Sequence, residues 1–292
     1  MARESIQDIK RRIKSVSSTE RITNSMRLVS AGKLRKARRI FEETNENSHF
    51  ITHTIGELFN SSDEVPQEYL EGSRDVNRTA YIIITSSKGL CGGFNSNVLK
   101  QAHAAIDAAS DAEEAAPLIV AIGGKGLEYF EKRGYNIYSS YLAPPESITF
   151  LEAEELSVPL IKMYDEGEID KIVMVYTSFV NSMEQKVMSQ TLLPFHIEKD
   201  PEMITSNQLT EYEPNVDVVF NYLIPKYVEM EIYSSIVESA TCEHAARRMA
   251  MESATDNAKE MLDRLNLNYN RARQAAITDQ IIEIVAGAEA QN

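Results

Sequence analysis

The feature that most restricts the fold of this 292-residue chain is a stretch of 61 residues, between Pro225 and Gly287, that contains neither proline nor glycine. An uninterrupted helix of that length measures about 90 Å, which is more than a compact domain of this size needs. Apolar and small residues recur along it in steps of three and four, the spacing of one helix face. That face comprises Met251, Ala254, Ala258, Met261, Leu265, Tyr269, Ala272 and Ala276. The stretch is therefore predicted to be a long helix with a buried stripe.

A second long helix is predicted at the other end of the chain. Residues 5–58 contain no proline and two glycines, Gly32 and Gly56. Their apolar stripe is approximately heptad and comprises Ile6, Ile9, Ile13, Val16, Ile22, Met26, Val29, Ala37 and Ile40. Because isolated helices are marginally stable in water, the two helices most simply bury their stripes against each other. The sequence thus predicts an antiparallel, or otherwise closely paired, coiled coil of the two termini.

The middle of the chain alternates between strand-like and helix-like segments. Near-continuous apolar runs occur at residues 81–85, 118–122, 171–179 and 186–193. This alternation predicts an α/β fold with a largely parallel, Rossmann-like sheet. The predicted domains are a coiled-coil helix at 1–60, an α/β body at 75–210 and a second coiled-coil helix at 215–292. The body is thus inserted between two helices that form one discontinuous shaft.

Charge is distributed unevenly along the chain. The net charge is −14, yet residues 1–41 contain twelve Lys and Arg against three acids. A basic helix that leads into a zipper can contact nucleic acid, but here the basic residues interleave with the apolar stripe, and the acidic remainder would repel phosphates. We therefore expect no nucleic-acid partner, and a basic helical surface that faces acidic proteins.

Cysteine content and hydropathy bear on location. Cys91 and Cys242 lie far apart, in contexts unlike metal-binding spacings, which favours reduced thiols in a cytosolic compartment. No apolar run approaches the roughly 20 residues that span a bilayer, and charges separate Ile6, Ile9 and Ile13, unlike a signal-peptide core. We expect a soluble chain, at most peripheral to a membrane. The absence of a transit segment favours the cytoplasmic face of a bacterial plasma membrane, and a processed organellar chain stays open as the alternative.

Two glycine-rich segments raise the question of nucleotide binding. In TSSKGLCGGFNSN, residues 85–97, Lys88 precedes all the glycines, whereas a P-loop places its lysine after the second one. We interpret this segment as a structural strand-to-helix turn, with Asn95 or Ser96 capping the next helix. Its turn residues are Gly89, Gly92 and Gly93. The GGKG at 123–126 could hold an anion at a helix N-terminus, but a tight turn is the more economical interpretation.

Histidine spacing gives no metal or catalytic site. His244 follows Cys242 and Glu243 on a helix, where positions two apart point to different sides, so we expect a solvated helix face there. His49 and His53 have the spacing of a helical zinc pair, but no third ligand is evident. The sequence predicts no catalytic, cofactor-binding or metal site on this chain.

Three stretches together resemble one protein family. They are RRIKSVSSTERITNSMRLVSAGKLRKA, SSKGLCGGFNSN and EHAARRMAMESATDNAKEMLDRLNLNYNRARQAAITDQIIEIVAGA. These stretches, roughly 90 of the 292 positions, are similar to the gamma subunit of F-type, proton-translocating ATP synthases. Residues from about 100 to 210 are compatible with this family but not diagnostic of it. Ser87 and Lys88 stand where the family commonly has Asp-Arg, and Ala286 replaces a family glycine.

The resemblance implies a rotor shaft that is itself non-catalytic. In this family the coiled coil sits inside a hexamer of three alpha and three beta subunits. The α/β body stands on a membrane ring of c subunits, beside the epsilon subunit. Proton flow turns the ring and the shaft, and the beta-subunit sites then change affinity in sequence during ATP synthesis or hydrolysis.

The resemblance also implies which residues touch the beta subunits. Met26 matches a methionine that faces the beta-subunit lever region. Arg273 and Gln274 match residues that reach a beta-subunit loop, and Thr278 and Glu283 match positions functionally coupled to that methionine.

The remaining implied contact is with the c-ring, at Tyr212 and Glu213, where the surrounding sequence varies within the family. From the residues alone, two other functions stay open. The chain could be an α/β enzyme that uses one of its glycine-rich loops and oligomerises through its helices. It could also be a purely structural coiled-coil adaptor with no rotary role.

Overall fold

The computed structural model describes residues 5–61, 66–72, 75–111, 115–195 and 216–289. The chain forms two compact units. The helical unit takes in the chain up to Ser30 and from Arg247 onward, and the α/β unit takes in Ala31–Ala246. Helices α1 (Ile6–Ser61) and α5 (Val216–Glu289) contribute to both units. The predicted domain boundaries instead place each long helix in a single domain, and these boundaries remain a prediction.

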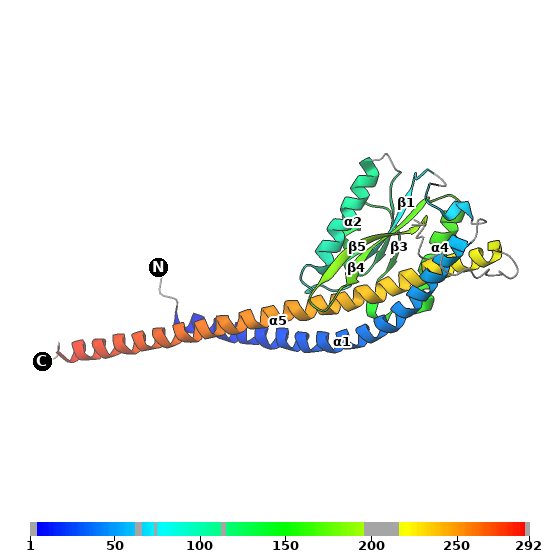
Figure 1. Ribbon diagram of the computed structural model, residues 1–292. Helices are drawn as coiled ribbons and strands as arrows, with labels where there is room; N and C mark the ends of the chain where they lie inside the picture. The colour runs from blue at the N-terminus through cyan, green and yellow to red at the C-terminus, as the bar shows by residue number, and fades with distance from the viewer. Residues whose placement is uncertain (1–4, 62–65, 73–74, 112–114, 196–215, 290–292) are drawn as a thin grey trace. The chain divides into compact units, whose positions relative to one another are not determined.

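The helical unit consists of the first part of α1 and the last part of α5, which run side by side in opposite directions (Figure 1). Small and apolar residues form the contact face, so the two backbones can approach closely. The buried residues of this unit are Ile9, Thr23, Ser30, Met251, Thr255, Ala258 and Leu265. Near the middle of the face, the hydroxyl oxygens of Thr23 and Thr255 lie 2.8 Å apart and link the helices.

Part of the predicted stripe points to solvent. Ile22, Val29 and Met261 are 57%, 60% and 47% exposed, so the prediction was wrong at these positions. Thr23 and Thr255 take the inner face there. Their hydroxyls also bond to backbone carbonyls of their own helices, at 3.0 and 2.7 Å. Satisfied hydroxyls can be buried without the penalty of an unpaired polar group, which hydrophobic periodicity does not register.

The α/β unit is built on a five-stranded sheet with the order β3-β2-β1-β4-β5. The strands are β1 (Thr79–Ile84), β2 (Leu118–Ile122), β3 (Ile137–Tyr141), β4 (Lys171–Phe179) and β5 (Gln185–Leu193). Strand β1 pairs in parallel with β2 and β4, with Ala80 opposite Leu118 on one side and Ile172 on the other. Strand β3 is parallel to β2, and β5 is antiparallel to β4.

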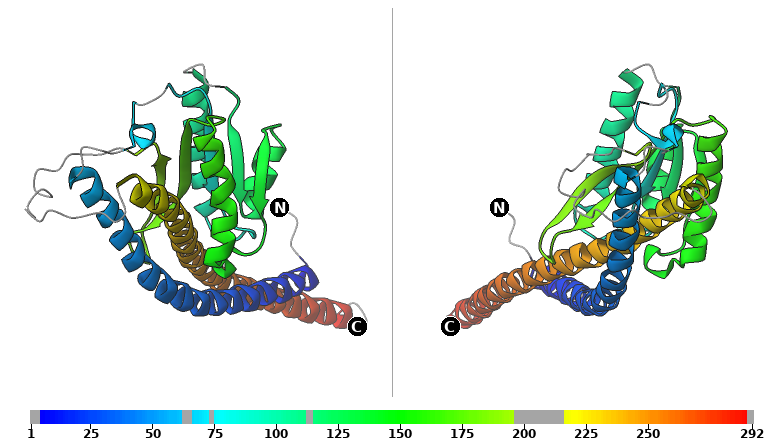
Figure 2. Two further views of the ribbon diagram at one scale, coloured as in Figure 1. Left: turned by 90° about the vertical axis from the view of Figure 1, so that its right-hand side faces the viewer. Right: turned by 45° about the vertical axis from the view of Figure 1, so that its right-hand side comes forward.

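Alternate residues of the central strands feed two separate cores. Ile82 and Ile84 pack with α4 (Phe150–Asp165) and with parts of α1 and α5. Tyr81 and Ile83 face the opposite way, toward α2 (Phe94–Asp111) and α3 (Gly124–Glu131). Helices therefore cover both faces of the sheet (Figure 2). Burial on both faces explains the continuous apolar runs of β1, β2 and β4. The predicted fold class, long terminal helices with an inserted Rossmann-like α/β domain, is confirmed.

Two elements depart from the sequence-based pattern. Strand β3, with the sequence IYSSY, lies at a sheet edge and alternates between half-buried and exposed residues, so it lacks the apolar run that marks the other parallel strands. Helix α5 begins at Val216 and continues through Pro225. The stretch free of proline and glycine is therefore only part of that helix.

Candidate functional site

The loop between β1 and α2 is held by hydrogen bonds within the chain. The Asn95 side chain accepts from the Ser86 backbone N–H at 2.9 Å and donates to the Ser86 hydroxyl at 2.7 Å. Gly92 and Leu90 both have a positive φ, of 58° and 64°. Because Asn95 turns back toward Ser86, and Ser96 donates to the Gly93 carbonyl, the predicted helix-capping role was wrong for both.

In the second glycine-rich segment, at the start of α3, the backbone amide of Gly126 is bound by the Thr85 side chain. Thr85, directly after β1, accepts from the Gly126 N–H at 2.8 Å and lies 3.0 Å from the Ile122 carbonyl oxygen. Gly123 has φ +88°, and a Cβ built on it would lie 2.1 Å from the Thr85 carbonyl oxygen. The GGKG segment is therefore a tight turn packed on the loop beside it, in which the Thr85 hydroxyl accepts from the Gly126 amide and the Ser86 carbonyl accepts from the Lys125 amide.

Open α/β sheets bind ligands in the crevice where the strand order reverses, outside the carboxyl ends of the strands. In this sheet that crevice lies between β1 and β4. The chain fills it with α5. Cys242 packs with Cys91 and Phe94 in one buried cluster, and the partly buried Phe179 lies against it. Beside them, the Glu238 carboxylate accepts from the Ser178 hydroxyl at 2.8 Å and from the Phe179 N–H at 2.7 Å.

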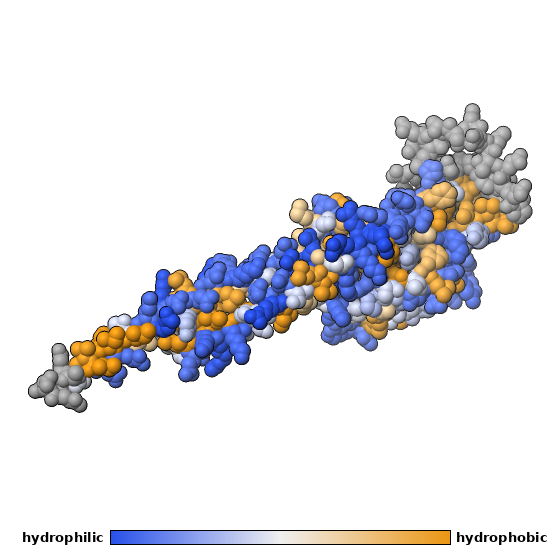
Figure 3. Space-filling model, turned by 90° about the horizontal axis from the view of Figure 1, so that it is seen from below, coloured by the Kyte–Doolittle hydropathy of each residue, from blue (hydrophilic) through white to orange (hydrophobic). Residues whose placement is uncertain are grey.

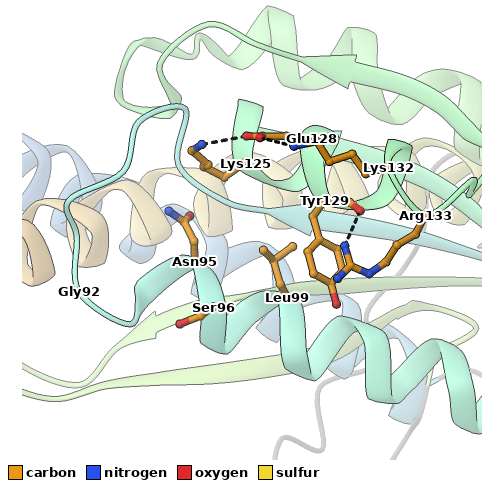
Figure 4. Close-up of a pocket in the computed structure, with 9 residues that line it drawn as sticks. All are labelled: Gly92, Asn95, Ser96, Leu99, Lys125, Glu128, Tyr129, Lys132 and Arg133. Carbon is orange, nitrogen blue, oxygen red and sulfur yellow. Dashed lines mark hydrogen bonds and ion pairs between the residues drawn. The ribbon is translucent and has the colours of Figure 1, made fainter.

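A hollow of about 440 Å³ lies between α2 and α3 (Figure 4). It is lined by Gly92, Asn95, Ser96, Leu99, Lys125, Glu128, Tyr129, Lys132 and Arg133. Lys125 and Lys132 each bind one oxygen of the Glu128 carboxylate at 2.8 Å, which holds the pKa of Glu128 at about 2. Arg133 lies over the Tyr129 ring, 3.5 Å from its centre, and donates to the Tyr129 carbonyl. Both oxygens of this carboxylate are thus held in ion pairs with lysines of its own helix.

His244 is buried, which corrects the prediction of a solvated helix face. Its side chain is 1% exposed, and its Nε2 atom lies 3.8 Å from Glu146 Oε1. The same carboxylate oxygen binds Lys33 Nζ at 2.6 Å. This cluster connects α1, the turn before α4, and α5 within the α/β unit. The sequence gives no signal for it, because the three residues lie far apart along the chain.

Two further expectations from the sequence concern metal binding and membrane insertion in the part of the chain that the structure describes. His49 and His53 are exposed on α1. In that part of the chain, no group of three or more His, Cys, Asp or Glu side chains could hold a metal ion. Among the described helices, none has a segment both long enough and apolar enough to cross a membrane.

The residues assigned by resemblance to beta-subunit contact lie in the helical unit. Met26 is half-buried on α1, while Arg273, Gln274, Thr278 and Glu283 are exposed on α5. Thr23 lies against Thr255 in an antiparallel pair, so Met26 lies near the level of residue 252, and Arg273 lies 21 positions beyond it, about 32 Å along the helix. The structure therefore places them at two levels of the helical unit.

The last turns of α5 expose an unusual amount of apolar side chain (Figure 3). The exposed residues there are Ile277, Ile281, Ile282, Ile284 and Val285, with exposed fractions from 48% to 71%. A contiguous exposed apolar surface marks a site that a partner covers. Tyr212 and Glu213, assigned to the c-ring contact, lie outside the described residues.

Comparison with known proteins gives a consistent match along the whole chain. A sequence model of the ATP synthase family matches residues 5–291. The ATP synthase gamma chain of Alkaliphilus metalliredigens is 42% identical over 289 residues, which cover 98% of both chains. The sodium ion specific ATP synthase gamma chain of Acetobacterium woodii is 41% identical over 309 residues, which cover 99% of both.

Solved structures share the fold. A chain of the Euglena gracilis mitochondrial ATP synthase, from a cryo-EM structure of its OSCP/F1/c-ring, aligns with a TM-score of 0.68 at 17% identity. That alignment covers 98% of this chain and 94% of the other. A chain of the Tetrahymena thermophila mitochondrial central stalk aligns with a TM-score of 0.60 at 23% identity and covers 80% and 99%, respectively.

Proposed function

The chain belongs to the ATP synthase gamma-chain family, and from this premise we propose that it is the central rotor shaft of an F-type ATP synthase. In this role it couples proton-driven rotation of a c-subunit ring to ATP synthesis or hydrolysis. The chemistry takes place at the beta-subunit sites of a hexamer of alpha and beta subunits.

The observation that carries this proposal is the exposed apolar end of α5 in the helical unit. Apolar contacts are non-directional, so such a surface can be enclosed by a partner and still turn inside it. A tightly complementary interface with strong anchors would instead hold one orientation. Charged side chains nearby, such as Arg273, supply the few directional contacts. Through these contacts, rotation of the chain can change the conformation of a beta-subunit loop.

We further propose that the chain carries no active site. Two geometric features support this. Glu238 and Cys242 of α5 fill the crevice in which an α/β sheet binds its ligand, and Thr85 occupies the amide at the start of α3. Family membership and these features together favour the rotor over an α/β enzyme with a helical stalk.

The partners follow from the same proposal. They are three alpha and three beta subunits, the epsilon subunit and the c-ring, the last through Tyr212 and Glu213. The chain would then be peripheral to the cytoplasmic face of a bacterial plasma membrane. The Acetobacterium relative is named as sodium ion specific, so the coupling ion should be tested by driving ATP synthesis in vesicles with a proton gradient and, separately, with a sodium gradient.

The decisive experiment is affinity purification of the chain, tagged at the exposed β4–β5 turn, from gently solubilised native membranes. We expect three alpha and three beta subunits for each copy of this chain. We also expect the purified complex to hydrolyse ATP and the chain alone to have no ATPase activity. When the chain is removed from the complex, the remaining ATPase activity should no longer respond to the ion gradient. Recovery of the chain alone, or activity in the rigorously purified chain, would overturn the proposal.

Replacing Arg273 and Gln274 together by alanine is expected to lower ATP turnover of the assembled complex about tenfold. Hydrogen bonds that involve a charged group contribute about 1.5–3 kcal/mol each, and 1.4 kcal/mol corresponds to a factor of ten in rate. Steady-state ATPase assays measure the effect. Alanine at Arg264 and Asn266, which are exposed on the same helix, serves as the control. Unchanged turnover in the first variant would remove both residues from the contact.

A further inference from the structure

The hollow between α2 and α3 contains an arginine that is held by an aromatic ring. Arg133 lies over the Tyr129 ring, and one of its nitrogens donates to the Tyr129 carbonyl oxygen at 3.0 Å (Figure 4). In the part of the chain that the structure describes, no Asp or Glu side chain pairs with this guanidinium. A guanidinium has five N–H donors and matches the geometry of a carboxylate. Most donors of Arg133 therefore remain available to a carboxylate from another molecule.

Aromatic packing holds Arg133 in place. Tyr129 meets the Phe130 ring edge to face, with ring centres 5.0 Å apart, and Phe130 meets Tyr135 in the same way at 5.3 Å. Phe130 is fully buried in the core on this side of the sheet. Edge-to-face pairs of this kind add to the stability of a packed cluster. The guanidinium is therefore positioned before a ligand binds, and less entropy is lost on binding.

The charge of the hollow favours an anionic ligand. Its charged lining consists of Lys125, Lys132, Arg133 and Glu128. These side chains give it a net charge of +2, on a chain whose net charge is −14. Each lysine binds one oxygen of the Glu128 carboxylate, which shows the kind of group that these cations bind. Lys125 and Lys132 are 42% and 69% exposed, so a ligand can also reach them.

The hollow also offers apolar surface beside these cations. The Leu99 side chain and the Tyr129 ring line it, and its volume is about 440 Å³. A small inorganic anion would contact the cations and leave that apolar surface in water. A peptide segment that carries an apolar side chain between acidic ones would cover both kinds of surface, as in an interface with an apolar centre and a polar rim. The lining therefore fits a peptide better than a free anion.

We propose that the hollow between α2 and α3 binds an acidic segment of a partner protein. In this arrangement, one carboxylate of the segment pairs with Arg133, and an apolar side chain packs against Leu99 and Tyr129. Glu128 competes with the segment for the two lysines, so the chain's own carboxylate keeps the affinity low. The inference does not depend on the proposed function, because it concerns binding of a peptide to the chain alone.

The test is an NMR titration of the deuterated, ¹⁵N-labelled full-length chain with the peptide acetyl-EELEE-amide. We expect the amide signals of Gly92, Ser96 and Lys125, which line the hollow, to shift. The dissociation constant should be on the order of 100 μM at low salt and rise severalfold at about 0.2 M salt, because exposed charges are screened. The neutral peptide acetyl-QQLQQ-amide should cause no shift. Equal shifts with both peptides, or acidic-peptide shifts that occur only in the basic part of α1 or nowhere, would overturn the inference.

Two substitutions should change the affinity in opposite directions. Arg133→Gln should weaken binding of the acidic peptide about fivefold or more, because it removes the stacked cation. Glu128→Gln should strengthen binding about threefold or more, because it releases Lys125 and Lys132. Both positions are exposed, so the variants should fold, and damage to the fold could not produce the gain.

Lys162→Gln is the matched control. It removes one positive charge at an exposed position of α4, which packs on the opposite face of the sheet. Its affinity for the acidic peptide should equal that of the parent chain. An equal loss in Arg133→Gln and Lys162→Gln would show that the peptide responds only to overall charge, and an unchanged affinity in Glu128→Gln would show that the lysines do not take part. Either result would overturn the inference.

Discussion

Met26→Lys is expected to reduce the number of ions pumped per ATP hydrolysed by about tenfold or more, with little loss of folding. Met26 is half-buried on α1 in the helical unit, so a lysine there can extend to solvent along the helix surface. Its ammonium adds a charge to an already basic helix and can pair with acidic residues of a beta subunit. A new charge-assisted bond of about 1.5–3 kcal/mol in one rotary position would resist the next step.

The measurement is ATP-driven ion pumping in membrane vesicles, divided by the ATPase rate of the same vesicles. Met183→Lys provides the matched control, because it makes the same change at a 78% exposed methionine in the β4–β5 turn of the other unit. Thermal unfolding of both variants separates loss of coupling from loss of structure. Normal pumping by Met26→Lys would count against the beta-subunit contact at this position.

The central sheet could be predicted from the sequence because its strands are buried on both sides. Ile82 and Ile84 enter one core, while Tyr81 and Ile83 enter the other. Every position of β1 is therefore apolar or buried, and the run stands out in the sequence. Strand β3 lies at an edge and lacks that constraint, so IYSSY resembles a loop as much as a strand.

The two long helices could be predicted from their length and their scarcity of proline and glycine, but their contact face could be predicted only in part. Of the predicted stripe, Ile9, Met251, Ala258 and Leu265 are buried. Thr23 and Thr255 form the inner contact, while Ile22 is exposed. A hydropathy scale ranks isoleucine as more apolar than threonine. It does not include the hydrogen bonds that both threonine hydroxyls make between the two helices and within them. Under the proposed function, exposed apolar residues such as Ile22 belong to a surface that a surrounding partner covers.

The polar contacts that position α5 could not be predicted from the sequence, for a different reason. Glu238 meets Ser178, and His244 meets Glu146, across sequence separations of about 60 and 100 residues. Neither pair belongs to a motif with a fixed spacing. The argument against a P-loop in residues 85–97 needed only the local order of Lys88 and the glycines. The sequence could not predict that α5 would occupy the ligand crevice, which is a consequence of the tertiary fold.

Gly123→Ala is expected to lower the free energy of unfolding of the α/β unit by about 4 kcal/mol. Two separate costs combine at this position. The backbone has φ +88° and ψ +142°, a region open essentially to glycine alone, which costs a residue with a Cβ about 1–3 kcal/mol. The added methyl group would also lie 2.1 Å from the Thr85 carbonyl oxygen, and relief of such overpacking costs about 1–3 kcal/mol more.

Gly124→Ala supplies a control one residue away in the same turn. The nearest atom to a Cβ built there is the Ser87 carbonyl oxygen at 3.6 Å, an ordinary contact, and its φ is outside the positive range. Since alanine also favours the helix that begins at this residue, the second variant should be as stable as the parent or slightly more so. Thermal and urea unfolding of the full-length chain, followed by circular dichroism, compare the two. Equal stability of both variants would mean that Thr85 does not hold the start of α3 against β1. The turn would then no longer explain why the Gly126 amide is closed to ligands, and the GGKG segment at 123–126 would again be a candidate for anion binding.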